Sequence, residues 1–205
     1  MEIVVRVLLG AALGGMATWL LAGAALRAPH SGWLAFGAAV GALTGVLSFR
    51  SGHYDVGPAM VSSLIASALL AIAVCDLRER RIPNRVIYPL LAGALCSAWV
   101  WPDRSVGAAF IGCAVAIGIV AALAVLTRRH DRGPAFGVGD LKLVVVLGAI
   151  VGWPLIAWSL LLGTTLGGIG AAVALIARQR TIAYGPYLVA GGLVALLWPG
   201  SSPWT

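Results

Sequence analysis

Charged residues are scarce in this sequence, and their scarcity excludes most classes of soluble protein. Only 10% of the 205 residues are charged, whereas 60% are hydrophobic, and the mean hydropathy is +0.98. A soluble domain normally carries about 25% charged residues and about 45–50% apolar ones. The composition therefore predicts an all-α, polytopic integral membrane protein that is surrounded by the lipid bilayer.

Cysteine and histidine are also rare, with three of each. Cys75, Cys96 and Cys113 form no C-x-x-C pair, so neither a disulfide framework nor a zinc site is indicated. We interpret them as small apolar side chains, and we expect no metal and no cofactor. The net charge of +7 does not indicate a nucleic-acid partner, because the basic residues lie in short loops and form no continuous basic face.

Apolar runs are abundant, and about eight of them are expected to be transmembrane helices. No linker or compositional break separates them, so residues 1–205 are expected to form a single membrane domain. A cleaved signal peptide is an alternative for the first run, but its amino end carries Glu2 and a single arginine, Arg6, rather than a basic segment. The expected runs are Ile3 to Leu26, Trp33 to Phe49, Pro58 to Cys75, Val86 to Trp101, Ser105 to Leu126, Pro134 to Trp153, Leu155 to Ala177 and Ile182 to Trp198.

The second run contains Gly37, Gly41 and Gly45, which recur every four residues. Glycines at this spacing lie along one side of a helix and allow a neighbouring helix to approach closely. The spacing therefore predicts tight packing of this helix against another one.

Lysine and arginine predict the orientation, because cytoplasmic loops of membrane proteins collect positive charge. If both termini are extracytoplasmic, 11 of the 14 basic residues lie on the cytoplasmic side and three lie outside. Tryptophans gather at the outer ends, as an aromatic belt does. The cytoplasmic set is Arg27, Arg78, Arg80, Arg81, Arg85, Arg128, Arg129, Arg132, Lys142, Arg178 and Arg180; the outer arginines are Arg6, Arg50 and Arg104; the expected belt is Trp99, Trp101, Trp153, Trp198 and Trp204.

Asp140 is informative because it stands in an otherwise apolar run that follows Gly137 and Gly139. An ionised aspartate within hydrocarbon costs at least about 2.5 kcal/mol, so we expect it to have a function. It could instead cap a helix over residues 141–153, but that helix would rise only about 20 Å, which is less than the roughly 30 Å of a bilayer core. We therefore expect the helix to begin near Pro134, with Asp140 about 9 Å along it.

Asp76 ends the third run and lies at the same cytoplasmic boundary as Asp140 in this topology. Two neighbouring carboxylates cannot both ionise, so one keeps a proton and the pair can activate a water between them. This is the minimum for aspartic-protease chemistry without a metal. A structural alternative for Asp76 is an ion pair with Arg80, one helical turn away.

The sequences around both acids resemble the signatures of the type IV prepilin peptidases, which are G-x-G-D intramembrane aspartic proteases. Asp76 is followed, after five residues, by Ile82-Pro83-Asn84, and Gly137-Val138-Gly139-Asp140 matches the second signature. A third similarity is Tyr184-Gly185-Pro186-Tyr187, where the family often has Phe-Gly-Pro-Phe. The resemblance covers a peptidase core of about residues 58–198 and implies that the two aspartates are the catalytic pair.

The resemblance implies an endopeptidase that cleaves the basic leader from prepilin-like or pseudopilin precursors at the cytoplasmic face of a bacterial inner membrane. Many members carry a cysteine-rich, zinc-binding insert between their first two spans, which accompanies methylation of the product. Here only Arg27 to Gly32 connect those runs, so methyltransferase activity is not expected. Ala183 replaces a family proline. The presenilin-like proteases show Tyr-Asp and Pro-Ala-Leu, whereas this chain has Cys75-Asp76 and no Pro-Ala-Leu.

The other motif residues have local interpretations. Gly137 and Gly139 serve either helix packing or kinking, or the approach of a substrate backbone to the helix. Pro83 ends the preceding helix, and Asn84 is expected to cap the next one. Lys142 either extends toward the cytoplasmic surface or holds an acidic substrate group.

The alternative function is a small proton- or cation-coupled membrane transporter that uses the same two aspartates as ion sites. Transport favours carboxylates near the middle of the membrane and an internal repeat, and the sequence shows neither. We therefore prefer the peptidase interpretation.

Overall fold

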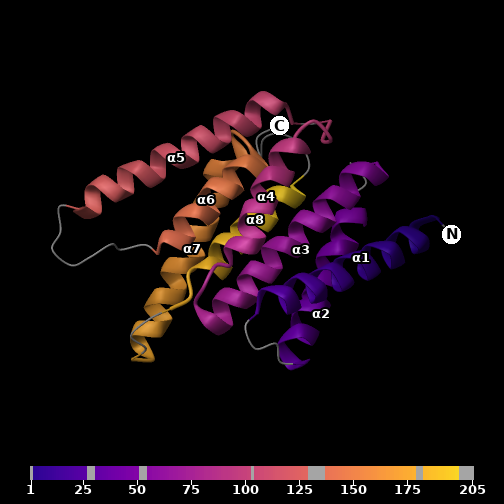
Figure 1. Ribbon diagram of the computed structural model, residues 1–205, viewed down its shortest axis with the longest axis horizontal. Helices are drawn as coiled ribbons and strands as arrows, with labels where there is room; N and C mark the ends of the chain where they lie inside the picture. Colours follow the sequence, from indigo (N-terminus) through magenta and orange to yellow (C-terminus); the bar gives the residue numbers. More distant parts are fainter. Residues whose placement is uncertain are drawn as a thin grey trace.

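The computed structural model describes residues 2–26, 31–50, 55–102, 104–128, 137–178 and 182–198. These residues form eight helices and no strand (Figure 1), which confirms the all-α expectation. The helices are α1 (Glu2–Ala25), α2 (Ser31–Arg50), α3 (Val56–Glu79), α4 (Asn84–Cys96), α5 (Val106–Arg128), α6 (Val138–Val151), α7 (Leu155–Ile176) and α8 (Gly185–Leu197).

Three of these helices, α1, α3 and α7, are long and apolar enough to cross a membrane. Shorter apolar stretches lie in α2, α5 and α8. This content supports a membrane protein. The number of spans and the extracytoplasmic placement of the termini remain predictions.

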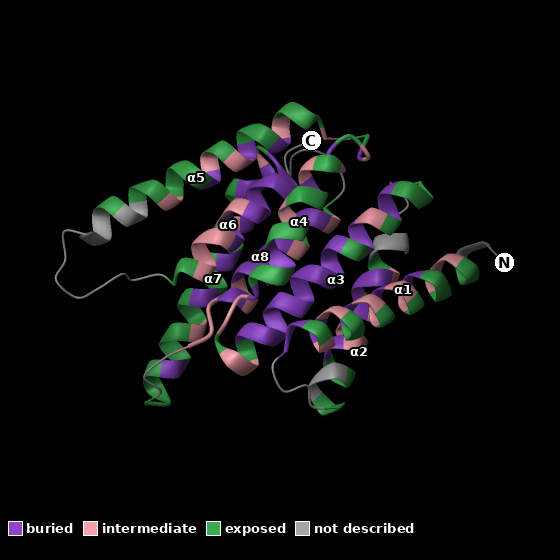
Figure 2. Cartoon of the chain, in the orientation of Figure 1, coloured by how far each residue is buried: buried purple, intermediate pink, exposed green. Residues whose placement is uncertain are grey.

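α3 lies at the centre of the helix assembly and packs against α1, α2, α4 and α8. Of its 24 residues, 16 are buried, and Figure 2 shows the helix as a largely buried element. Many of the buried residues are alanine or serine, whose small side chains allow neighbouring helices to approach closely. Asp76 is therefore carried by a helix that is held on several sides.

The glycines predicted to allow close packing do so between α1 and α2. A Cβ atom added to Gly41 or Gly45 would collide with the backbone of Gly14 or Gly10, respectively, whereas one at Gly37 would make ordinary contacts. The prediction is confirmed for two of its three glycines.

The sixth helix begins later than predicted. α6 starts at Val138, and Gly137 before it has an extended backbone (φ −67°, ψ 144°). Glycine is a poor helix former, which favours a boundary at this position. The expectation of a helix from near Pro134 is therefore wrong, and Asp140 lies in the first turn of α6 rather than about 9 Å along it.

The fourth helix ends earlier than predicted, at Cys96 rather than at Trp101. The Ser97 hydroxyl donates to the carbonyl oxygen of Gly93 at 2.7 Å, and the Trp99 indole N–H donates to that of Cys96 at 2.8 Å. Carbonyls in the last turn of a helix lack intrahelical partners. Side-chain donors satisfy them here, so the chain can leave the helix.

The predicted tryptophan belt is wrong at Trp101, which is only 2% exposed. Its indole N–H donates to the Ser62 hydroxyl at 3.0 Å, and this bond supplies the partner that a buried indole requires. Trp101 therefore belongs to the core. The exposed members of the set are Trp99, Trp153 and Trp198, whereas Trp204 lies outside the described residues.

Candidate active site

Asp76 lies in the last turn of α3 and is 6% exposed. The helix continues three residues beyond it, to Glu79. The cap residue Arg80 follows with a left-handed backbone (φ 50°), and its N–H donates to the Asp76 carbonyl oxygen at 2.8 Å. The Asp76 carboxylate Oδ2 accepts the backbone N–H of Gly185 at 2.9 Å. This bond connects the first signature of the sequence directly to the third.

Gly185 is the first residue of α8, and Pro186 follows in the first turn. A Cβ atom on Gly185 would lie 2.7 Å from Asp76 Oδ2, so a side chain here would displace the carboxylate. Proline suits the first turn because its missing N–H has no intrahelical partner there. Glycine and proline therefore let the start of α8 present a backbone donor to Asp76.

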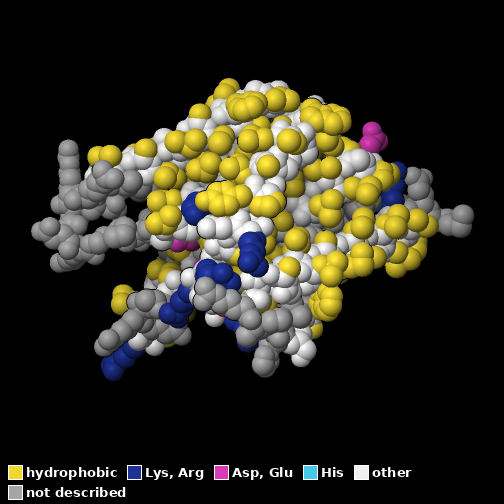
Figure 3. Space-filling model, viewed as in Figure 1, with side chains coloured by type: hydrophobic (Ala, Val, Ile, Leu, Met, Phe, Trp, Pro, Cys, Tyr) yellow, Lys and Arg dark blue, Asp and Glu magenta, His cyan; other side chains and the backbone are white. Residues whose placement is uncertain are grey.

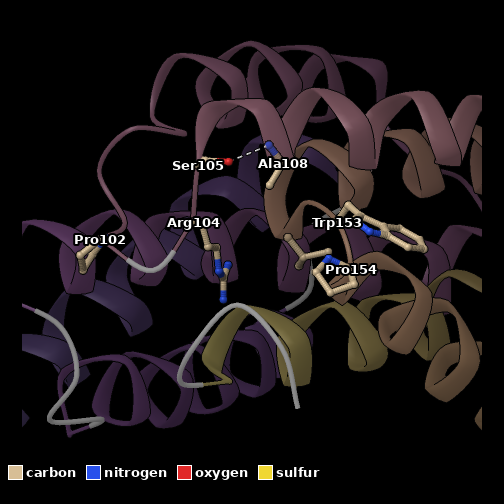
Figure 4. Close-up of a pocket in the computed structure, with 7 residues that line it drawn as sticks. Pro102, Arg104, Ser105, Ala108, Trp153 and Pro154 are labelled. Atoms are coloured by element: carbon tan, nitrogen blue, oxygen red, sulfur yellow. Dashed lines mark hydrogen bonds between the residues drawn. The ribbon is translucent and has the colours of Figure 1, made fainter. Parts of the chain in front are cut away.

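The opposite end of α8 is held by Arg104. One guanidinium nitrogen, Nη2, donates to the carbonyl oxygens of Ala195 at 3.1 Å and Leu196 at 3.0 Å. Arg104 lines a cavity of about 410 Å³ together with Ser105, Trp153 and Pro154; Figure 4 shows these side chains. A cation at the carbonyl end of a helix is electrostatically favourable. α8 is thus fixed at both ends, which restricts the position of Gly185.

Asp140 is half-buried in the first turn of α6. Its Oδ2 atom lies beside Gly137, where a Cβ would be 3.2 Å away. The charge of Asp76 acts on the Asp140 carboxyl group through space. The structure thus places the two predicted acids in the last turn of α3 and the first turn of α6, near enough for one charge to act on the other.

Gly139 faces the turn that follows α3. A Cβ on Gly139 would lie 3.1 Å from the Ile82 side chain, which is closer than ordinary contact. Of the two interpretations of Gly139, this contact supports helix packing. Ile82 thereby holds the start of α6 against the turn that follows Asp76.

Tyr184 directly precedes α8, and its ring lies where a side chain on Gly167 of α7 would be. Partial burial and the nearby Asp140 carboxylate raise the pKa of the Tyr184 phenol. The phenol therefore keeps its proton at neutral pH. Tyr184 adds a neutral aromatic group next to the second acid.

Asn84 does not cap α4 as predicted. The cap residue is Pro83, and no side chain makes a capping hydrogen bond there. The Asn84 side-chain oxygen instead accepts a hydrogen bond from Lys142 Nζ at 3.0 Å. Lys142 Nζ also lies 5.3 Å from the centre of the Tyr88 ring. Lys142 thus joins the second signature to the first.

A cavity of about 560 Å³ opens beside the turn after α3 and is lined by residues 24–26 and 81–85. Arg81 crosses it, since Nη2 donates to the Ala25 carbonyl oxygen at 3.0 Å and to Glu79 at 2.9 Å. Ile82 lines the cavity and also contacts Gly139. In Figure 3, Lys and Arg side chains gather near the ends of α3 and α7 on an otherwise largely hydrophobic face.

No group of three or more His, Cys, Asp or Glu residues that could hold a metal ion occurs in the described part of the chain. Cys75, Cys96 and Cys113 are free thiols. The three histidines lie outside the described residues. The expectation of a metal-independent site remains a prediction.

The nine predicted site residues lie where α3 ends and where α4, α6 and α8 begin. The contacts of Gly185 with Asp76, of Lys142 with Asn84 and of Gly139 with Ile82 connect these helix ends. Sequence reasoning did not assign site positions to Ile82, Tyr88 and Tyr184. Ile82 belongs to the motif that follows Asp76, and Tyr184 belongs to the motif around Gly185 and Pro186, so both motifs indicate these positions. Tyr88 could have been found because it is four residues after Asn84, on the same side of a helix.

Residues 63–172, more than half of the chain, match the sequence profile of the Type IV leader peptidase family. This range includes Asp76 and Asp140. No solved structure matches the chain significantly.

The curated relatives include the prepilin leader peptidase/N-methyltransferase of Aeromonas hydrophila, which is 32% identical over 146 residues, or 69% of this chain and 50% of that protein. The protein of the same name from Bacillus subtilis is 28% identical over 151 residues, covering 72% and 58%. The one from Pseudomonas aeruginosa is 28% identical over 160 residues, covering 76% and 54%. The chain spans about half the length of these relatives.

Proposed function

Because this chain belongs to the Type IV leader peptidase family, we propose that it is an intramembrane aspartic endopeptidase with Asp76 and Asp140 as its catalytic pair. The observation that carries this proposal is the junction of α3, α6 and α8, where one buried carboxylate accepts a backbone hydrogen bond and acts electrostatically on a second. Such a pair can hydrolyse a peptide bond without a metal.

The two acids have different surroundings, which suggests different roles. Asp76 accepts the Gly185 N–H at the start of α8, where the helix dipole favours negative charge. Asp140 lies in the field of that charge, and the second of two close carboxyl groups keeps its proton. We therefore assign the base to Asp76 and the acid to Asp140.

In the first step, Asp76 takes a proton from water while the water oxygen attacks the scissile carbonyl carbon. Asp140 donates its proton to the carbonyl oxygen, which gives a neutral tetrahedral intermediate. The C–N bond then breaks, the proton held by Asp76 passes to the leaving amine, and a hydroxyl proton of the intermediate returns to Asp140. Both carboxyl groups end in their starting states.

The proposed substrate is a prepilin-like or pseudopilin precursor whose basic leader is removed at the cytoplasmic face of a bacterial inner membrane. Names of the curated relatives support the substrate class. A cytoplasmic location for this end of α3 is supported by the basic residues between its last turn and the start of α4, Arg78, Arg80, Arg81 and Arg85.

The proposal is tested by co-expressing the chain with candidate prepilins and measuring leader removal by a gel shift and by mass spectrometry. Asp140→Asn should abolish cleavage. Asp55→Asn is a matched control, because Asp55 is an exposed acid at the other end of α3. Cleavage by Asp140→Asn at a rate close to that of the unaltered chain would contradict the aspartic mechanism.

A further inference from the structure

We propose that Lys142, Asn84 and Tyr88 form a latch that sets the distance between the two catalytic segments, which makes Lys142 a positioning residue. The Lys142 ammonium donates to Asn84 Oδ1 at 3.0 Å and lies 5.3 Å from the Tyr88 ring centre. Asn84 and Tyr88 are one turn apart on α4 and so face the same side. The term "latch" means these three residues throughout, and the inference rests on the proposed peptidase function.

The need for a latch follows from the packing. α3 and α6 carry the two aspartates, and both helices contact α4 and α8. The relative position of the acids is therefore transmitted through these two intermediaries. On the α8 side, the transmitting contact is the Gly185 N–H to Asp76 hydrogen bond. On the α4 side, it is the latch.

The latch lies close to both acids along the chain. Asn84 follows Asp76 by eight residues, across the turn that ends α3, and Lys142 follows Asp140 by two. Gly137 precedes α6 and Gly139 lies in its first turn, so the start of this helix is intrinsically weak. Its contacts with the turn and with α4 include Gly139 against Ile82 and the latch. Loss of the latch should weaken the restraint on Asp140 from this side, because the polar contact between α4 and α6 is removed.

The chemistry of the latch suits a site with two acids. Residues two apart on a helix point in different directions, so Lys142 is directed away from Asp140 and does not neutralise it. An amide oxygen and an aromatic face can both hold an ammonium group without a negative charge. The latch therefore fixes α6 without bringing a third carboxylate near the pair.

The test uses the full-length purified protein and two readouts. In the first, Lys142→Met should lower kcat about 10- to 100-fold, since misplacing a catalytic group by about 1 Å can cost 100-fold, while KM changes much less. Lys142→Arg should recover part of the loss, and Asn84→Leu should reproduce it from the α4 side. The double variant should be no worse than either single one. Arg78→Gln, which removes a neighbouring cation outside the latch, should behave as the unaltered chain does.

The second readout does not depend on cleavage. In a chain whose native cysteines are replaced by alanine, Asp76→Cys and Asp140→Cys are combined, and their cross-linking rate with a short bifunctional thiol reagent is measured. Lys142→Met should slow cross-linking, and Lys142→Arg should restore it. An unchanged rate in Lys142→Met overturns the latch whatever cleavage shows, as does a loss confined to KM. If Asp140→Asn still cleaves, the proposed function fails, but the cross-linking rate still decides on the latch.

Discussion

The hydrogen bond from Gly185 to Asp76 gives the sharpest prediction about the site. Gly185→Ala places a methyl carbon 2.7 Å from Asp76 Oδ2, about 0.7 Å short of the 3.4 Å at which ordinary contact begins. The three atoms nearest to this carbon all belong to Asp76, so either its carboxylate or the start of α8 must move. The bond of 2.9 Å would then exceed the usual limit of about 3.2 Å for an N–H to oxygen bond.

The expected cost follows from the charge on the acceptor. A hydrogen bond to a charged group contributes about 1.5–3 kcal/mol, which corresponds to a loss of roughly 10- to 150-fold in turnover if the bond orients Asp76 in the reaction. The measurement is single-turnover cleavage of a purified prepilin-type substrate, together with the thermal unfolding temperature of each variant. The unfolding temperature separates an effect on the site from an effect on folding.

Gly168→Ala is the matched control for this experiment. Gly168 lies on the neighbouring helix α7, and a Cβ there would meet no atom within 4 Å. Alanine in a helix is favoured over glycine by about 0.8–1.0 kcal/mol, so this control should fold at least as well as the unaltered chain. If Gly185→Ala and Gly168→Ala both cleave within about twofold of the unaltered chain, Gly185 does not hold Asp76 for catalysis, and the reasoning is refuted.

Three further predictions concern the pair, the topology and the metal. Asp76→Asn and Asp140→Asn should each abolish cleavage, and the double variant should be no worse than either, because members of a pair are not additive; additive losses in single-turnover rates would contradict a shared role. In a chain without native cysteines, cysteines introduced by Arg81→Cys and Arg129→Cys should be shielded from a membrane-impermeant thiol reagent in intact cells. The cysteine introduced by Ser202→Cys should be labelled. Labelling at position 81 would contradict the predicted topology. Chelators should leave cleavage unchanged. When S-adenosylmethionine is supplied, mass spectrometry should find an unmodified amino terminus on the product; a mass gain of one methyl group would show that the chain transfers methyl groups.

The helices could be predicted from the sequence because long apolar runs indicate membrane helices. Boundaries depend on local chemistry that hydrophobicity does not report. Bilayer thickness predicts a start of the sixth helix near Pro134. In the structure Gly137 has an extended backbone, and the helix begins after it, at Val138. The expected end of the fourth helix at Trp101 likewise followed from apolar character. In the structure, Trp101 lies outside the helix and is buried in the core, where its indole N–H donates a hydrogen bond to the Ser62 hydroxyl.

The candidate acids could be predicted because a carboxylate among apolar residues is costly and therefore conspicuous. The bonds that position them could not. Lys142 and Asn84 are 58 residues apart, and Gly185 and Asp76 are 109 apart. No local pattern pairs such distant residues. The prediction that Asn84 caps α4 rests on the preference for asparagine at helix starts. In the structure its side-chain oxygen instead accepts a hydrogen bond from Lys142 of α6.

The positioning bonds also explain which changes the site can tolerate. The donor to Asp76 is a backbone N–H, so it depends on the conformation at the start of α8 rather than on a particular side chain nearby. Ala183, the departure from the family proline, precedes Tyr184 and supplies no atom to the Asp76 hydrogen bond. Gly185 is different, because a side chain at this position would occupy the space of the carboxylate. We therefore expect substitutions to be tolerated where a motif residue only shapes the loop. We expect them to be harmful where its backbone or side chain connects the helices that carry the acids.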